Sequence, residues 1–165
     1  MQQKTTAPGS GEGSTRIHAR LAELGLTLPE MAAPLASYSR TLRSGDHLYV
    51  SGQLPMIAGR LAATGKVGAE VSVEQAAGLA RLCALNLLAA IGESVGLARF
   101  VKLVKVTGFV ASAPGFTGQP AVVDGASDLF LAVLGEAGRH ARSAVGVAEL
   151  PLGAPVEVEL IAEVA

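Results

Sequence analysis

The segment that most constrains the fold is 156–164, because apolar and polar side chains alternate along it. One set of alternate positions is entirely apolar, with Val156, Val158, Leu160, Ala162 and Val164. The other set is mainly acidic, with Glu157, Glu159, Ile161 and Glu163. Such alternation predicts a β-strand with one buried face and one face that meets water or another subunit. A sheet with one apolar face needs helices to cover it.

Two segments predict those helices. Ser72 and Gln75 form a capping-box pattern that opens a helix extending to about residue 95, and Gly96 can end it. The segment 119–134 repeats apolar residues at helical spacing and predicts the second helix.

Four further strands are predicted. Two short segments, 39–42 and 47–51, are joined by a glycine-containing turn and predict a hairpin. The segments 101–111 and 141–147 predict the other two strands, and 101–111 is rich in β-branched valine. The resulting order is hairpin, helix, strand, helix, strand, strand. This order predicts an α+β fold with both helices packed on one face of the sheet.

The N-terminal part of the chain differs from the rest. Residues 1–14 are rich in Gly, Thr, Gln and Ser without periodicity and predict a disordered tail. A short helix is expected over 15–24, followed by an extended connector with two prolines. With a length of 165 residues, we expect one domain over 15–165 that carries an N-terminal helical extension over 15–35.

Composition limits the partners. Only 16% of the residues are charged, which suggests that some surface is buried in an oligomer. A net charge of -1, 4% aromatic residues and no Trp give no support for nucleic-acid binding. Cys83 is the single cysteine and is expected to be a buried, inert thiol. The longest apolar run, 82–91, is too short to span a bilayer and contains Asn86, so we expect a cytoplasmic protein without a membrane partner.

Arg142 and Glu157 are the residues with the clearest chemistry. They lie on the last two predicted strands, which a short loop joins, and a strand pair so connected would bring them together. Arginine offers a planar set of N–H donors for a carboxylate, and glutamate can hold or activate water. The pair therefore predicts a site that binds a small carboxylate and performs acid–base chemistry. The alternative is structural, with Arg142 paired to Glu157 or Glu159.

Other apparent motifs are weaker. His18, His47 and His140 have no ligand spacing, so no metal is predicted. His140 and Ser143 are three residues apart on a predicted strand and would point to opposite faces, which argues against a catalytic triad.

Several segments in the expected order resemble the RidA/YjgF family of imine and enamine deaminases. They are Ala141-Arg142-Ser143, the Leu150-Pro151-Leu152-Gly153 turn, the strand at 156–159, Tyr38-Ser39, and Val50-Ser51-Gly52-Gln53-Leu54-Pro55. The resemblance runs from about Ala36 to the C-terminus. It implies a homotrimer of chorismate-mutase-like α+β domains with clefts between subunits.

The resemblance also implies roles for individual residues. Arg142 would bind the substrate carboxylate, Glu157 would position water, and the substrate would be lined by Tyr38, Gly52, the backbone N–H of Ala144, and Asp124. Three positions depart from the common pattern: His140 replaces a proline, Ala144 a cysteine and Asp124 a ligand-contacting asparagine. These departures leave the substrate open.

The implied activity is hydrolytic deamination of reactive 2-imino or 2-enamino acids to 2-keto acids and ammonia, with no metal or organic cofactor. One alternative is a non-catalytic trimer that binds 2-keto acids through Arg142. Another is a chorismate-mutase-type isomerase, since that fold also uses arginine and glutamate at subunit clefts. Family members have been called ribonucleases, but the low charge and few aromatic residues give that role no support.

Overall fold

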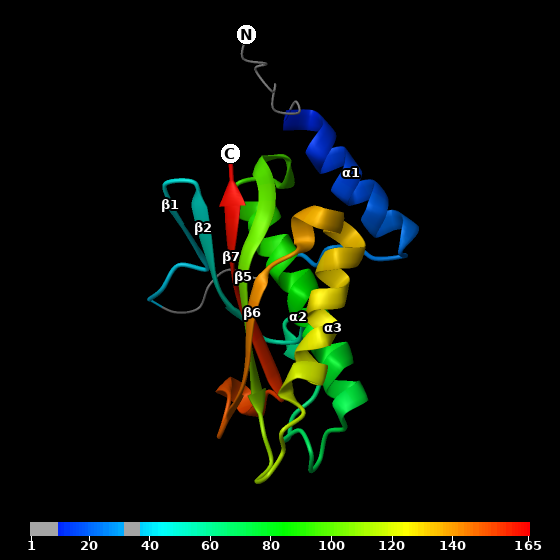
Figure 1. The fold of residues 1–165 in the computed structure, drawn as a ribbon, viewed down its shortest axis with the longest axis vertical. Helices are drawn as coiled ribbons and strands as arrows, with labels where there is room; N and C mark the ends of the chain where they lie inside the picture. Colours follow the sequence, from blue (N-terminus) through cyan, green and yellow to red (C-terminus); the bar gives the residue numbers. More distant parts are fainter. Residues whose placement is uncertain (1–9, 32–36) are drawn as a thin grey trace.

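The computed structural model describes residues 10–31 and 37–165, with side chains described from Thr15 onward. A five-stranded sheet carries two long helices on one face (Figure 1). The helices are α1 (Ser10–Glu23), α2 (Val73–Ser94) and α3 (Gln119–Leu134), and short 3-10 turns cover η1 (Leu97–Arg99), η2 (Gly135–Gly138) and η3 (Pro151–Gly153). The strands are β1 (Thr41–Ser44), β2 (His47–Gln53), β3 (Met56–Ile57), β4 (Arg60–Leu61), β5 (Phe100–Ala111), β6 (Ala141–Val147) and β7 (Val156–Val164).

The sheet order is β1-β2-β7-β5-β6, with β5 and β6 parallel and the other neighbouring pairs antiparallel. The predicted pairing of the last two strands is therefore wrong, because β5 lies between β6 and β7. A short loop limits the distance between two strands but does not make them neighbours. The fully apolar row of β7 suits a central strand, whereas the polar residues of β6 suit an edge.

The helix-covered face forms the core, as the alternation along β7 predicts. Its five apolar residues are at most 2% exposed. The predicted capping box is present at the start of α2, where Ser72 and Gln75 bond each other's backbone N–H groups. The helices α2 and α3 cross so closely that a Cβ atom at Gly125 would overlap the backbone carbonyl of Ala77. This contact fixes α3 against α2.

Helix α2 is long and apolar enough to cross a membrane by length and composition, but more than half of its most apolar window is buried inside the domain. Asn86, in the middle of the helix, donates from Nδ2 to the carbonyls of Leu54 and Met56 at 2.9 and 3.3 Å. The helix thus has the position of a core helix of the domain.

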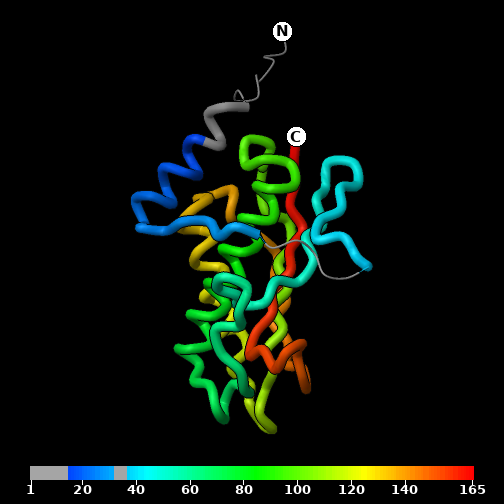
Figure 2. Tube along the Cα trace, turned by 180° about the vertical axis from the view of Figure 1, so that it is seen from behind, coloured from blue at the N-terminus to red at the C-terminus, as the bar shows by residue number. Residues whose placement is uncertain are grey.

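The N-terminal helix α1 begins at Ser10, five residues before the predicted start. Ile17 and Leu21 are buried against the domain, and Arg20 Nε donates to the carbonyl of Ala132 at 2.8 Å. Figure 2, which views the molecule from behind, shows the chain after α1 passing across the helices. Residues 1–9 of the expected tail and 32–36 of the expected connector lie outside the described residues.

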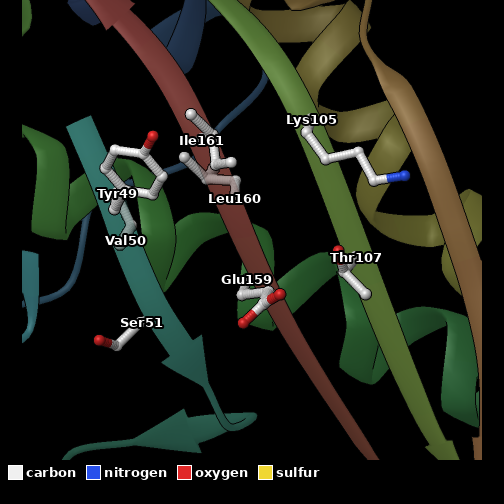
Figure 3. A pocket seen from close by; sticks show the side chains of 8 residues that line it. All are labelled: Tyr49, Val50, Ser51, Lys105, Thr107, Glu159, Leu160 and Ile161. Atoms are coloured by element: carbon white, nitrogen blue, oxygen red, sulfur yellow. The ribbon is translucent and has the colours of Figure 1, made fainter. Parts of the chain in front are cut away.

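The other face of the sheet is uncovered in the single chain. Exposed apolar side chains on this side include Tyr49 and Val145, which are 45% and 41% exposed. A shallow cavity of about 220 Å³ lies here between β2, β7 and β5. Figure 3 shows Glu159 and Thr107 on neighbouring strands at this cavity. We call this side the open face.

Candidate functional site

Arg142 points to the helix-covered side of the sheet. It lies beside Val106 of β5 in the parallel register, and Val106 is fully buried under the helices. Arg142 Nη1 donates to Asp124 Oδ1 of α3 at 2.7 Å, and Nη2 donates to the Pro120 carbonyl at 3.4 Å. The arginine side chain is 24% exposed and the aspartate side chain 57%. The ion pair is therefore partly open to solvent at the edge of the sheet.

The alternative in which Arg142 forms an ion pair is therefore partly correct. The arginine is ion-paired, but its partner is Asp124 and neither Glu157 nor Glu159. Asp124 is the residue that the family resemblance aligned with a ligand-contacting asparagine. The pair therefore lies where a ligand is expected.

A second set of hydrogen bonds, through Ser127 to His140, orients Arg142. Its Nη1 also donates to Ser127 Oγ at 3.1 Å, and Ser127 Oγ lies 3.0 Å from His140 Nε2. His140 Nδ1 lies 2.6 Å from the Gly138 carbonyl, which can only accept, so Nδ1 carries the proton. The Ser127 hydroxyl then donates to Nε2 and keeps a lone pair for the arginine. A neutral His140 fits this network of bonds.

The environment of His140 favours that neutral form. Burial lowers the pKa of His140 and the positive charge of Arg142 lowers it further, although the bond to the Gly138 carbonyl opposes this. The ring also packs edge-to-face against Phe130 with centroids 5.9 Å apart. Asp124, Ser127, His140 and Arg142 line one small cavity. We call these four residues with Ala144, the next residue on the same side of β6, the arginine half-site.

Glu157 lies on the open face. It is beside Phe109 of β5 in the register, three residues beyond Val106, and an odd offset along a regular strand reverses the side. Its carboxylate packs against Gly52, where a Cβ atom would overlap it. Gly52 falls in an irregularity of β2, between Val50 and Gln53, where the register with β7 shifts. The bulge and the missing side chain together create the space for the carboxylate.

Burial raises the pKa of Glu157, and the negative charge of Glu159 adds to the effect. Tyr38 is 60% exposed and lines a cavity of about 300 Å³ together with Gly52, Arg40 and Leu54. We call Tyr38, Gly52 and Glu157 the glutamate half-site. Glu157 itself does not line this cavity and reaches it only through its contact with Gly52. A carboxyl group with a raised pKa is suited to exchanging protons with water.

The structure therefore divides the six predicted residues into two groups. Arg142, Asp124 and Ala144 lie at the β6 edge on the helix-covered side. Gly52 lies on β2, Tyr38 precedes β1, and Glu157 lies on the central strand β7 on the opposite face from Arg142. The prediction that Arg142 and Glu157 meet within one chain is wrong, because it assumed that their strands pair.

Sequence reasoning missed one member of the site, Ser127. Its position three residues after Asp124 on a predicted helix places both on one face, which is the signal that could have found it. The rejection of a Ser143–His140 triad is confirmed, since Ser143 Oγ accepts from Lys105 Nζ at 2.7 Å, while His140 bonds Ser127. Cys83 is buried, as expected, and burial raises its pKa well above the usual value.

Comparisons with known proteins agree with this fold and with the resemblance. A family model described as "YjgF/chorismate_mutase-like, putative endoribonuclease" matches residues 18–164. Protein TCP17 of Trypanosoma cruzi is 47% identical over 152 residues, which cover 91% of this chain and 95% of that protein. A 2-iminobutanoate/2-iminopropanoate deaminase of Dermatophagoides farinae is 31% identical over 137 residues, which cover 82% of this chain and 92% of that protein.

Solved structures give the same result. A protein of unknown function from Agrobacterium tumefaciens is 47% identical with a TM-score of 0.88, and the match covers 94% of this chain and 96% of that chain. TdcF of E. coli, solved with bound serine, is 25% identical with a TM-score of 0.55, and the match covers 79% of this chain and 90% of that chain.

Proposed function

The chain belongs to the RidA/YjgF family, and from this premise we propose that it is a cytoplasmic enzyme that hydrolyses reactive 2-imino or 2-enamino acids to 2-keto acids and ammonia. The observation that carries the proposal is the division of the site. One chain holds Arg142, bonded to Asp124, on the helix-covered side at the β6 edge of its sheet, and Glu157, a carboxyl group with a raised pKa, on the open face of the central strand β7.

Two such halves are complementary between copies. In the proposed assembly, the β6 edge of one copy lies against the open face of the next, which brings Arg142 of the first toward Glu157 of the second. A contact of this head-to-tail kind forms a ring where the rotation between copies closes, and a filament where it does not. The family resemblance implies a ring of three. The uncovered sheet face, with Tyr49 and Val145 exposed, offers apolar surface for such an assembly.

The chemistry requires only water and these two side chains. The substrate carboxylate accepts hydrogen bonds from Arg142, which orients the imine carbon. Glu157 takes a proton from water as the water oxygen bonds to the carbon of the protonated imine, which gives a neutral carbinolamine. Glu157 then returns the proton to the nitrogen. The carbon–nitrogen bond breaks and ammonia leaves as the hydroxyl gives its proton to the Glu157 carboxylate and becomes the carbonyl. The raised pKa of Glu157 suits a group that accepts and then returns a proton.

The ligands of two relatives support the proposed class of substrate. One of them is named as a deaminase of 2-iminobutanoate and 2-iminopropanoate, and TdcF was solved with serine, a small amino acid. Both ligand types carry a carboxylate next to a carbon–nitrogen bond, which is the grouping that Arg142 and Glu157 would bind together.

The test is a coupled assay in which an amino-acid oxidase generates a panel of imino acids and the release of ammonia is timed. Glu157→Gln keeps the size of the side chain but cannot take a proton, so hydrolysis should fall by roughly 10²-fold with ligand affinity preserved. Glu159→Gln is the control, because it lies two residues further on the same face of β7.

Three outcomes would count against the enzyme. Equal rates for Glu157→Gln and wild type would remove the acid–base role. A wild type that does not accelerate hydrolysis of any imino acid over buffer would favour the non-catalytic binding protein. Light scattering that gives a monomer at micromolar concentration would contradict the ring.

A further inference from the structure

We infer that Asp124 makes this site selective for zwitterions, which carry a positive nitrogen beside the carboxylate, over simple carboxylate anions such as 2-keto acids. The inference rests on the proposed function, since it concerns the ligand of the same arginine. It follows from the 2.7 Å ion pair between Arg142 Nη1 and Asp124 Oδ1.

The ion pair leaves Arg142 able to bind a further group. Nη1 is occupied by Asp124 and Ser127, and Nη2 makes one long bond of 3.4 Å to the Pro120 carbonyl. Within the described part of the chain, Nε makes no hydrogen bond. A ligand carboxylate can therefore approach the Nε and Nη2 edge while Asp124 remains bonded to Nη1.

The net charge of the Arg142–Asp124 pair determines which kind of ligand is attracted to it. Arg142 and Asp124 together are neutral, so a simple anion meets little net attraction and stands close to a second carboxylate. A zwitterion offers its carboxylate to Arg142 and its ammonium or iminium nitrogen to Asp124. The aspartate side chain is 57% exposed, and within the described part of the chain only its Oδ1 is hydrogen-bonded, which leaves Oδ2 as an acceptor for such a nitrogen.

Asp124 holds a fixed position for this task. The next residue, Gly125, lies against the backbone of Ala77 where α2 and α3 cross, so this part of α3 is closely packed. Ser127, one turn later, ties Arg142 to His140 from the other side. The backbone that carries Asp124 is thus held in place, and Arg142 is bonded from two sides.

The selectivity has a consequence for turnover. A protonated 2-imino acid is a zwitterion, whereas the 2-keto acid that hydrolysis forms is an anion without the nitrogen. The same residue pair would thus hold the substrate and release the organic product. A neutral asparagine at this position would not distinguish the two by charge.

Calorimetry with L-alanine and pyruvate tests the inference, because these ligands share a three-carbon skeleton and differ in the nitrogen. Wild type should bind L-alanine at least about tenfold more tightly than pyruvate. In Asp124→Asn that preference should disappear or reverse, with pyruvate binding about tenfold more tightly than to wild type. Asp124→Glu should restore part of the preference, and Asp128→Asn, an exposed aspartate one turn along α3, should leave it unchanged. Thermal melting checks that each variant is folded.

Equal affinity of wild type for both ligands, or an unchanged preference in folded Asp124→Asn, would overturn the inference. So would a wild type that hydrolyses imino acids but binds neither probe. The proposed enzyme can fail separately: a wild type with the expected preference and no imine hydrolysis would keep the zwitterion site and remove the deaminase.

Discussion

The arginine half-site and the glutamate half-site differ in how many ionic and hydrogen-bonding partners a single chain provides for their charged side chains. Arg142 already has an ionic partner and a hydrogen-bonded chain through Ser127 to His140. Glu157 makes no ion pair with the described residues, and its pKa is raised by burial and by Glu159. In the proposed function, the first half-site orients a ligand and the second exchanges a proton. The difference indicates that binding and chemistry can be separated by mutation.

The largest effect is expected from Arg142→Lys, which alters the arginine half-site alone. Lysine keeps the charge but is a point donor and cannot bond Asp124, Ser127 and a ligand carboxylate in one plane. The loss of two charge-assisted hydrogen bonds predicts about 10²-fold weaker binding of L-alanine by calorimetry.

Arg139→Lys is the matched control, because Arg139 lines the same cavity but pairs with Glu136. If Arg142→Lys binds L-alanine as tightly as wild type does, Arg142 is structural.

Gly52→Ala should act on the glutamate half-site alone. The added methyl group overlaps the Glu157 carboxylate, which must move away from its place in the bulge. We expect imine hydrolysis to fall roughly 10-fold, with L-alanine affinity close to that of wild type, because a displaced catalytic group loses its alignment.

Gly78→Ala serves as the control, since an added Cβ there meets no atom within 4 Å. Unchanged hydrolysis in Gly52→Ala would mean that the position of the carboxylate does not matter for the reaction.

The smallest effect concerns stability, and here the two half-sites should respond to pH in opposite directions. The raised pKa of Glu157 means that the folded state binds this proton more readily than the unfolded state does. Its contribution to stability is therefore present at low pH and is lost as pH rises through the folded pKa. The lowered pKa of His140 has the reverse effect, so its contribution is lost as pH falls below the usual range for histidine.

Denaturant unfolding at pH 4 and pH 7 measures this difference. Relative to wild type, Glu157→Gln should become more stable as the pH rises from 4 to 7. His140→Gln should become more stable relative to wild type as the pH falls from 7 to 4. Both changes should stay within about 1 kcal/mol. The same pH dependence for both variants would remove the electrostatic contrast between the half-sites.

Local patterns explain why much of the fold was predictable. The alternation along 156–164 and the capping box at Ser72 are set by neighbouring residues, and both appear in the structure as expected. The start of α1 was placed too late, because Gly11 and Gly13 disfavour a helix on their own. A helix whose later turns are packed, as α1 is at Ile17 and Leu21, can extend through such residues.

The arrangement of the site was not predictable in the same way. The face on which Arg142 and Glu157 lie depends on which strand sits beside each, and the insertion of β5 between β6 and β7 is not encoded near either residue. Sequence reasoning identified Asp124 and Arg142 separately. Their contact joins residues 18 positions apart, on a helix and a strand whose packing is decided by the whole core.

The close crossing of α2 and α3 at Gly125 has a consequence for how such a protein can diverge. Because the backbone there is held by the Ala77 contact, residue 124 can change its charge without moving the helix that carries it. Its side chain is largely exposed, so the core would be little disturbed. Ligand preference could therefore drift by one substitution at a time on an unaltered scaffold, with each intermediate protein still folded.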